Sequence, residues 1–193
     1  MLMTKNSQKG STMMEVLALL TIISIFSVFL IKIISNVYGI FKQSMAIYEI
    51  KDVQKGISGV YNFAGDYKIL FDGVDYKEIL CKDKSIPSQM CIKSGSSYEI
   101  KHRLSGDVII SPSTDFKSYT IKVDGLSKKN CIEFVNINWL DKKKVDIYQL
   151  DINDDPVAYF PIKNGKGFPV EFSTSFNKCT KEDKSNTVIW YFY

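Results

Sequence analysis

The chain has 193 residues, of which 45% are hydrophobic and 24% charged, and its formal net charge is +4. This length allows one soluble domain beside a membrane segment. Without the first ten residues the charge falls to +2, from 23 basic and 21 acidic residues. A near-neutral chain argues against charge-driven binding to nucleic acid. We interpret two lysine clusters, 128–129 and 142–144, as solvated turns or helix ends; contact with DNA or a surface is the alternative.

A short basic leader ends at Lys9-Gly10, and Glu15 then precedes sixteen uncharged residues, Val16–Ile31. From residue 16 to 41 the only charged side chain is Lys32. As a helix this segment would be about 39 Å long, more than the hydrocarbon core of a bilayer. The pattern predicts a membrane-spanning helix. A carboxylate at its start costs several kcal/mol unless a positive group pairs with it.

Two ordinary explanations of the apolar segment compete. It could be an uncleaved anchor, in which Glu15 reaches the membrane interface. It could also be a secretory signal, with Lys5 and Lys9 as its basic start. The nearest cleavage candidate for a signal is Val37–Gly39, which follows Lys32 and has a weak small-residue pattern.

The sequence Gly-Ser-Thr-Met-Met-Glu at 10–15 resembles the processing site of type IV prepilins. The resemblance implies that a prepilin peptidase cuts after Gly10, so that Ser11 becomes the N-terminus and its amine is methylated. Ser11 differs from the phenylalanine common there. Glu15 matches the family's glutamate, whose carboxylate pairs with the N-terminal ammonium of a neighbouring subunit. The apolar helix then stays on the mature chain.

The helical pattern continues beyond the apolar segment. Five apolar residues recur at steps of four and three and share one helical face: Ala46, Ile50, Val53, Ile57 and Val60. Charges such as Glu49 are expected on the other faces. We predict one helix from about residue 12 to 60, with an amphipathic second half that packs on a globular domain. Glycines at 39, 56 and 59 each weaken it by up to about 1 kcal/mol.

The rest of the chain alternates turns and strand-like segments. Within 62–105, short apolar pieces at 67–71 and 91–92 predict a small helix or hairpin. A second helix is expected at 127–139, with Ser127 as N-cap. The last segment must be paired inside a sheet, and prolines suggest edges or bends at 157–162 and 168–172. The expected strands are 107–111, 119–123 with a turn at Asp124-Gly125, 145–152, 157–162, 168–172 and 187–193.

Four cysteines suggest two disulfides beyond a membrane anchor: Cys81, Cys91, Cys131 and Cys179. Three pairings are possible, and we favour Cys81–Cys91 and Cys131–Cys179. The longer loop would remove about 4 kcal/mol of unfolded-state entropy. Zinc binding is the alternative, but there is no Cys-x-x-Cys pair and only one histidine.

The Leu-Ser-x-x-x-Cys helix at 126–131, with Cys179 eight residues before the final strand segment, is similar to type IVb pilins. That class includes toxin-coregulated and thin conjugative pilins. The resemblance implies an α+β pilin fold, in which a long N-terminal helix packs on an antiparallel β-sheet (an αβ-roll) with a disulfide-bracketed C-terminal region. It also implies a leader at 1–10, a membrane or filament-core half-helix at 11–40 and an extracytoplasmic domain at 41–193.

We find no catalytic arrangement and expect no cofactor or metal. His102 is the only histidine, lies between Lys101 and Arg103, and is predicted to be a surface residue. The spacing of the acidic residues in 151–155 suggests a calcium-binding site, and pseudopilins, which this chain resembles, bind calcium. The segment lacks the glycine and the distant glutamate of an EF-hand loop. We predict a solvated turn there.

The sequence therefore predicts a structural subunit and not an enzyme. It would be a single-pass inner-membrane precursor, cut by the prepilin peptidase and added by the assembly platform to an extracellular filament of identical subunits. The alternatives are a minor pilin or type II secretion pseudopilin, and a membrane-anchored periplasmic binding or adhesion module. Adhesion, motility, DNA uptake, conjugation and secretion all use such subunits.

Overall fold

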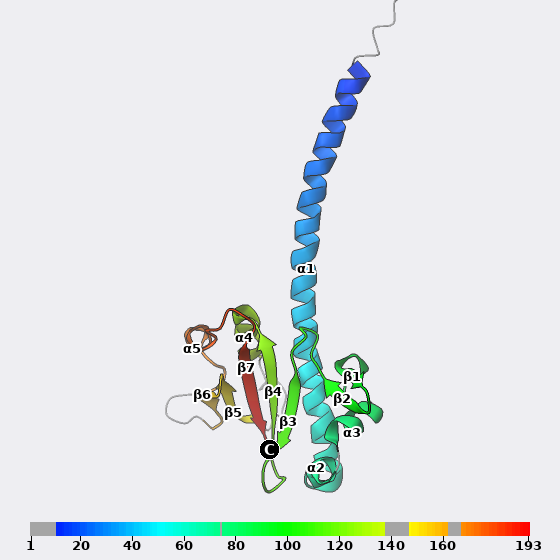
Figure 1. Ribbon diagram of the computed structural model, residues 1–193. Coiled ribbons are helices and arrows are strands. Elements are labelled where there is room, and N and C mark those ends of the chain that lie inside the picture. Colours follow the sequence, from blue (N-terminus) through cyan, green and yellow to red (C-terminus); the bar gives the residue numbers. More distant parts are fainter. Residues whose placement is uncertain (1–10, 74, 138–146, 162–166) are drawn as a thin grey trace, which may run out of the picture. The chain divides into compact units, whose positions relative to one another are not determined.

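The computed structural model describes residues 11–73, 75–137, 147–161 and 167–193 (Figure 1). The chain divides into two compact units, 1–41 and 42–193. In the first unit, helix α1 (Ser11–Ala64) begins at Ser11. Its large apolar side chains from Met13 to Phe41 are 49–74% exposed, so this part of α1 is apolar all round. Among the described residues, α1 is the one helix with the length and composition to cross a membrane.

The second unit contains the end of α1 and two antiparallel sheets. The larger sheet has the order β3-β4-β7-β5-β6, and the smaller is the β1-β2 hairpin. The strands are β1 (Cys91–Ser94), β2 (Ser97–Ile100), β3 (Val108–Pro112), β4 (Tyr119–Leu126), β5 (Ile147–Ile152), β6 (Asp155–Tyr159) and β7 (Asn186–Phe192). The short helices are α2 (Lys68–Phe71), α3 (Tyr76–Lys82), α4 (Lys128–Val135) and α5 (Phe172–Lys178), with a 3-10 turn at Ser88–Met90.

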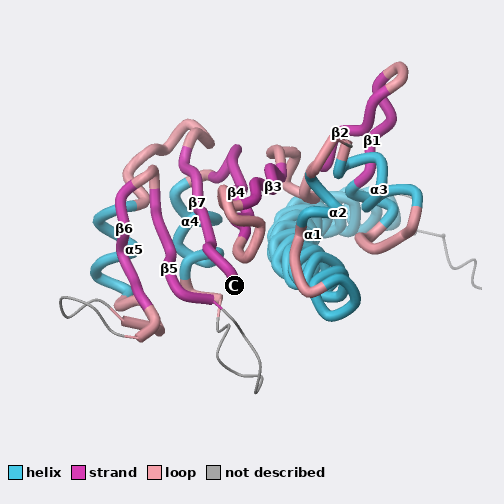
Figure 2. Tube along the Cα trace, turned by 90° about the horizontal axis from the view of Figure 1, so that it is seen from below, coloured by secondary structure: helices cyan, strands magenta, loops and turns pink. Residues whose placement is uncertain are grey.

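The core lies on one face of the larger sheet. Alternate residues of the two central strands are buried there: Tyr119, Ile121 and Val123 of β4, and Val188, Trp190 and Phe192 of β7. Helix α4 packs on β4 and β7, and α5 packs on α4 (Figure 2). The α4 residue Phe134 lies 6.1 Å from Trp190 between ring centroids. The period of two in each strand therefore matches burial of one face.

From Lys42 onward, α1 contributes its apolar stripe to the same core. Ala46, Ile50, Val53 and Ile57 are fully buried, which confirms the predicted face. The hydroxyls of Ser58 and Tyr119 are 3.2 Å apart, which joins α1 to β4. The long helix on an antiparallel sheet is the predicted pilin architecture.

Several local predictions are confirmed. The apolar segment 67–71 was predicted as a small helix or hairpin, and its residues from Lys68 onward form α2. The segment Cys91-Ile92 begins the β1-β2 hairpin. Ser127 caps α4 by accepting a hydrogen bond from the Asn130 amide at 3.4 Å. Helix α4 ends at Val135, four residues early, and the end of the predicted helix lies outside the described residues. The predicted strand 157–162 is β6, which begins two residues earlier, ends before Pro161 and is an edge strand as expected.

Two strand predictions are wrong. Asp124-Gly125 does not end β4; it lies in a bulge, where Gly125 has φ +69° and the strand continues to Leu126. A glycine in this conformation suits a bulge as well as a turn. The segment 168–172 is not a strand: Pro169 lacks a ladder donor, and α5 begins at Phe172.

Both disulfides join the pairs favoured from the sequence. Cys81 of α3 bonds to Cys91 of β1, and Cys131 of α4 bonds to Cys179 just after α5. Helix α3, which carries Cys81, was not expected. Its N-cap Asp75 accepts a hydrogen bond from the Lys77 amide at 3.0 Å.

Candidate assembly site

Glu15 is the single acidic residue in the exposed apolar part of α1, from Met13 to Phe41. It is exposed, and the next acidic residue along the chain is Glu49. The three hydroxyl side chains between 16 and 31 bond to carbonyls of their own helix: Thr21 to Ala18, Ser24 to Leu20 and Ser27 to Ile23, at 2.7–2.8 Å. Those hydroxyls are therefore satisfied without water. Ser11 is the first residue of α1, and Gly10 lies outside the described residues.

The arrangement on α1 leaves one ionisable group between residues 13 and 31. A carboxylate has no donor of its own and must accept hydrogen bonds. In hydrocarbon a positive partner from another molecule would offset its desolvation. The surface around Glu15 is suited to packing against other apolar helices, since its neighbours Met14 and Val16 are more than half exposed.

In the second unit, an ion pair between buried Glu49 and partly exposed Arg103 attaches α1 to the turn after β2. Glu49 is 2% exposed, although its charge predicted another helical face. Its carboxylate accepts two hydrogen bonds from Arg103, from the backbone amide at 3.0 Å and from Nε at 2.9 Å. The position of Glu49, three residues after Ala46 and four before Val53, places it on the buried stripe. That spacing is the sequence signal that could have found it.

His102 is buried rather than on the surface, so that prediction is wrong. Its ring is 2% exposed and lies 6.0 Å from the ring of Phe134. Nε2 is 2.9 Å from the carbonyl oxygen of Asp124, and Nδ1 accepts a hydrogen bond from the Leu104 amide at 3.2 Å. Burial lowers the pKa of His102, and the Asp124 carbonyl and nearby carboxylates oppose that shift only in part.

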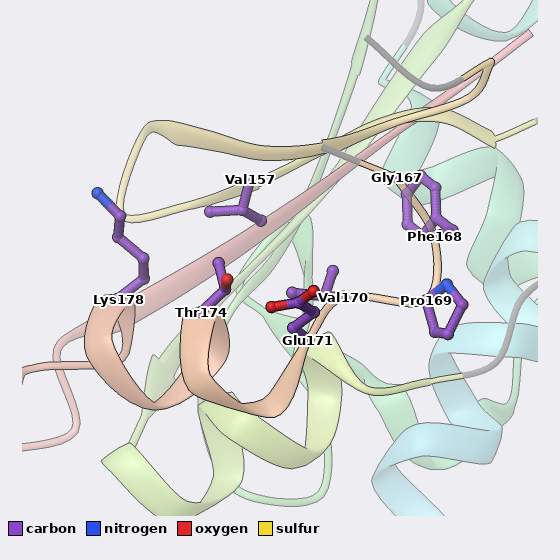
Figure 3. Close-up of a pocket in the computed structure, with 8 residues that line it drawn as sticks. All are labelled: Val157, Gly167, Phe168, Pro169, Val170, Glu171, Thr174 and Lys178. Atoms are coloured by element: carbon purple, nitrogen blue, oxygen red, sulfur yellow. The ribbon is translucent and has the colours of Figure 1, made fainter. Parts of the chain in front are cut away.

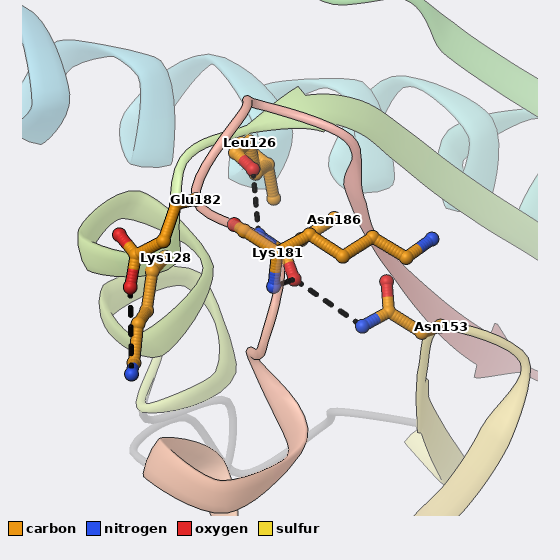
Figure 4. A network of polar contacts seen from close by, with 6 residues as sticks. All are labelled: Leu126, Lys128, Asn153, Lys181, Glu182 and Asn186. Atoms are coloured by element: carbon orange, nitrogen blue, oxygen red, sulfur yellow. Dashed lines mark hydrogen bonds and ion pairs between the residues drawn. The ribbon is translucent and has the colours of Figure 1, made fainter.

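Two asparagines form hydrogen bonds that connect segments on both sides of the Cys131–Cys179 disulfide. Asn186 is fully buried; its Nδ2 donates to the carbonyls of Leu126 and Lys181, and its Oδ1 accepts from the Lys181 amide (Figure 4). Asn153 donates to Asn186 Oδ1 at 3.2 Å. These bonds join the β4–α4 corner, the β5–β6 turn and the loop after α5. The network depends on residues distant in sequence, and no local pattern indicated it.

A hollow of about 330 Å³ lies between α5, the loop before it and β6 (Figure 3). Its apolar lining includes Val157 and Phe168, and its polar lining includes Glu171, Thr174 and Lys178. An ion pair joins Lys178 to Asp155, the first residue of β6. The lining offers one acid, one amine and one hydroxyl, and the single histidine of the chain lies elsewhere.

The prediction of a solvated turn at 151–155 is correct only for residues 153–154, because Asp151 lies in β5 and Asp155 in β6. Asp151 is 4% exposed and accepts hydrogen bonds from Gln149 and from Tyr191, both at 2.8 Å. Burial and this carboxylate raise the pKa of Tyr191. Asp154 lies 3.7 Å from Lys122. Among the described residues, no three histidine, cysteine, aspartate or glutamate side chains are grouped to hold a metal ion.

One predicted lysine cluster lies at the start of α4, as expected for a helix end. Lys128 pairs with Glu182 at 3.6 Å (Figure 4), and its ammonium is 4.3 Å from the Phe176 ring centroid. The cluster at 142–144 lies outside the described residues.

Comparison with known proteins supports one family. The sequence model of the PilS N-terminal family matches residues 41–192. The crystal structure of a type IVb pilin from Salmonella typhi gives a TM-score of 0.58 at 12% identity, covering 76% of this chain and 97% of that chain. TcpA, a type IV pilin from the Vibrio cholerae El Tor biotype, gives 0.51 at 11% identity, covering 79% and 99%. No curated protein sequence matches the chain.

The apolar helix, the antiparallel sheet and the disulfide-bracketed C-terminal region together define the type IV pilin fold, like that of the Salmonella typhi type IVb pilin. The family match covers most of the chain. The protein belongs to the PilS N-terminal family.

Proposed function

We propose that this protein is a structural subunit of a type IVb-like pilus. The prepilin peptidase removes residues 1–10, and methylation follows on the amine of Ser11. The half-helix 11–40 anchors the subunit in the inner membrane and later enters the filament core, while 41–193 forms the extracytoplasmic surface. Its partners are further copies of the same chain, the peptidase and the assembly platform.

One observation supports this proposal most directly: α1 exposes all its large apolar side chains from Met13 to Phe41. Apolar surface of this extent is not left in water by a stable soluble protein. A bilayer covers it before assembly, and the same helices of neighbouring subunits cover it afterwards. The surface therefore serves both storage and polymerisation.

Glu15 gives the polymerisation step its selectivity. Its carboxylate remains costly beside lipid, and the freed ammonium of a neighbouring Ser11 offsets this cost only when two subunits are in register. Cleavage after Gly10 is thus required before assembly, because it creates the positive partner. The pairing fixes the axial position of each new subunit.

Mass spectrometry of the mature N-terminus tests processing. In cells with a prepilin peptidase we expect a chain that begins with methylated Ser11. A retained Met1, or a cut beyond Lys32, would contradict the proposal. Replacing Gly10 should leave the precursor uncut.

Assembly is tested with Glu15→Gln, which keeps the shape and removes the charge. We expect normal processing and at least tenfold less sheared filament than wild type when the variant is the only subunit expressed. The matched control is Thr21→Val, which removes a polar group that is satisfied within its own helix. Efficient filaments from Glu15→Gln would refute the pairing.

A further inference from the structure

The His102 ring is fixed in one neutral form by its two partners. A carbonyl oxygen only accepts, so Nε2 must carry the hydrogen toward Asp124 at 2.9 Å. A backbone amide only donates, so Nδ1 must present its lone pair to Leu104 at 3.2 Å. A second proton would go to Nδ1 and would face the Leu104 N–H directly. Because the ring is 2% exposed, water cannot take over that hydrogen bond without an opening of the structure.

The turn that contains this ring is tightly built. The His102 amide donates to the Gly106 carbonyl at 3.0 Å, and the Ser105 amide donates to the His102 carbonyl at 2.8 Å. A Cβ on Gly106 would lie closer than 3.0 Å to both the Asp124 carbonyl and His102 Nε2. The ring therefore has little freedom to rotate within the closed turn.

The same turn provides both donors that satisfy Glu49 of α1. The Arg103 amide and Nε lie 3.0 and 2.9 Å from the two carboxylate oxygens. Glu49 is as deeply buried as His102. Opening the turn would leave its carboxylate without these donors, and an uncompensated buried charge is strongly unfavourable. Protonation of the ring and attachment of α1 are thus coupled through one residue, Arg103.

We propose that the 102–106 turn is a pH-sensitive attachment: when His102 takes up a proton, the turn opens and releases Glu49, so the 42–64 part of α1 loosens from the domain. The consequence is a subunit whose helix is held firmly at neutral pH and less firmly in acid. No other part of the described structure needs to change charge for this response.

Several charged groups face the ring from the elements around it. Glu49 of α1, Asp107 before β3 and Asp124 of β4 favour the protonated form, and burial opposes it more strongly, so the pKa is lowered. Two cations flank His102 in sequence: Arg103, which pairs with Glu49, and Lys101, which pairs with Glu99 and Asp107. A lowered pKa in the closed state means that the open state binds more protons. The closed turn is therefore fully favoured above the ordinary pKa of histidine, about 6.5, and loses stability as the pH falls below it.

Hydrogen exchange of the full chain in detergent micelles tests this coupling. Carboxylates titrate near pH 4, so His102 is the one side chain in this sequence with an ordinary pKa between pH 5.5 and 7.5. After correction for the intrinsic exchange rate, we expect protection of amides at 47–57 and 102–106 to fall about tenfold from pH 7.5 to 5.5. Amides at the centre of β7 should change less than twofold.

The control variant is His102→Gln, whose amide can still donate toward Asp124 but does not titrate. We expect its protection at 47–57 to be independent of pH over this range. An equal fall in protection for wild type and His102→Gln would overturn the proposal. If the variant does not fold, the NMR signal of the single imidazole in the wild type decides: the ring of the closed state must titrate below the ordinary histidine pKa of about 6.5 while the amides lose protection. A closed-state ring that titrates at or above about 6.5 would also overturn the proposal, because the closed turn would then not oppose protonation.

Discussion

Gly56 and Gly59 provide a matched test of how α1 packs on the domain, because one is tightly packed and the other is exposed. Both are interior residues of the same helix. A Cβ on Gly56 would come closer than 3.0 Å to the carbonyl oxygen of Ser85 and to 3.0 Å from its carbonyl carbon. A Cβ on Gly59 would have no atom within 4 Å outside its own helix.

The two substitutions are expected to change the free energy of unfolding in opposite directions. Alanine is favoured over glycine by up to about 1 kcal/mol in a helix interior, so Gly59→Ala should stabilise the protein by about that amount. At Gly56 the same gain is opposed by overpacking, which typically costs about 1–3 kcal/mol. Here the obstacle is backbone and not a flexible side chain. Ser85 cannot retreat easily, because Ile86 beside it is buried and the Cys81–Cys91 disulfide closes its loop. We expect Gly56→Ala to lose about 2 kcal/mol.

Urea unfolding in detergent, followed by tryptophan fluorescence, measures both variants. Trp190 is fully buried and reports the core directly. The predicted gap between the two alanine variants is about 3 kcal/mol, well above the error of the method. If Gly56→Ala were as stable as Gly59→Ala, the close approach of α1 to Ser85 would be refuted.

Three further variants test the C-terminal region and the loop before the sheet. Replacing Cys131 and Cys179 by alanine should cost about 4 kcal/mol, since the bond closes a separation of 48 residues. Replacing Cys81 and Cys91 should cost about 3 kcal/mol, since their separation is 10; an equal or larger loss would contradict the loop-length argument. Asn186→Ala should cost about 3 kcal/mol, because it leaves the Leu126 carbonyl and the Lys181 amide without their partner. The control is Asn177→Ala, which replaces the exposed asparagine of α5. Equal unfolding midpoints for Asn186→Ala and Asn177→Ala would argue against the network.

The sequence predicts those parts of the fold that local pattern determines. The apolar stripe from Ala46 to Ile57 and the dense strand at 186–192 are set by spacing and composition alone. The N-cap at Ser127 is a local signal of the same kind. The even number of cysteines and their spacing also indicated the two disulfides.

The features that sequence analysis missed depend on distant partners. Glu49 and His102 are polar and were expected at the surface, yet each is buried because a group far along the chain satisfies it. Asp124-Gly125 has the composition of a turn, but the neighbouring strand β7 continues the ladder beyond it. Helix α5 has only seven residues, and its place is fixed by packing on α4 and by Cys179.

The order of strands has a consequence for how the domain is made. Strand β7 is the last in sequence but pairs with both β4 and β5, so it joins the β3-β4 and β5-β6 hairpins into one sheet. Until residues 186–192 are available, β4 and β5 each present an open edge, and Trp190 and Phe192 are missing from the core. A chain emerging from its N-terminus can therefore form local helices and hairpins early, but it completes its core only with its final strand. In the proposed membrane-anchored precursor, the bilayer would hold the first unit during that interval, which would limit the encounters that such open edges otherwise permit.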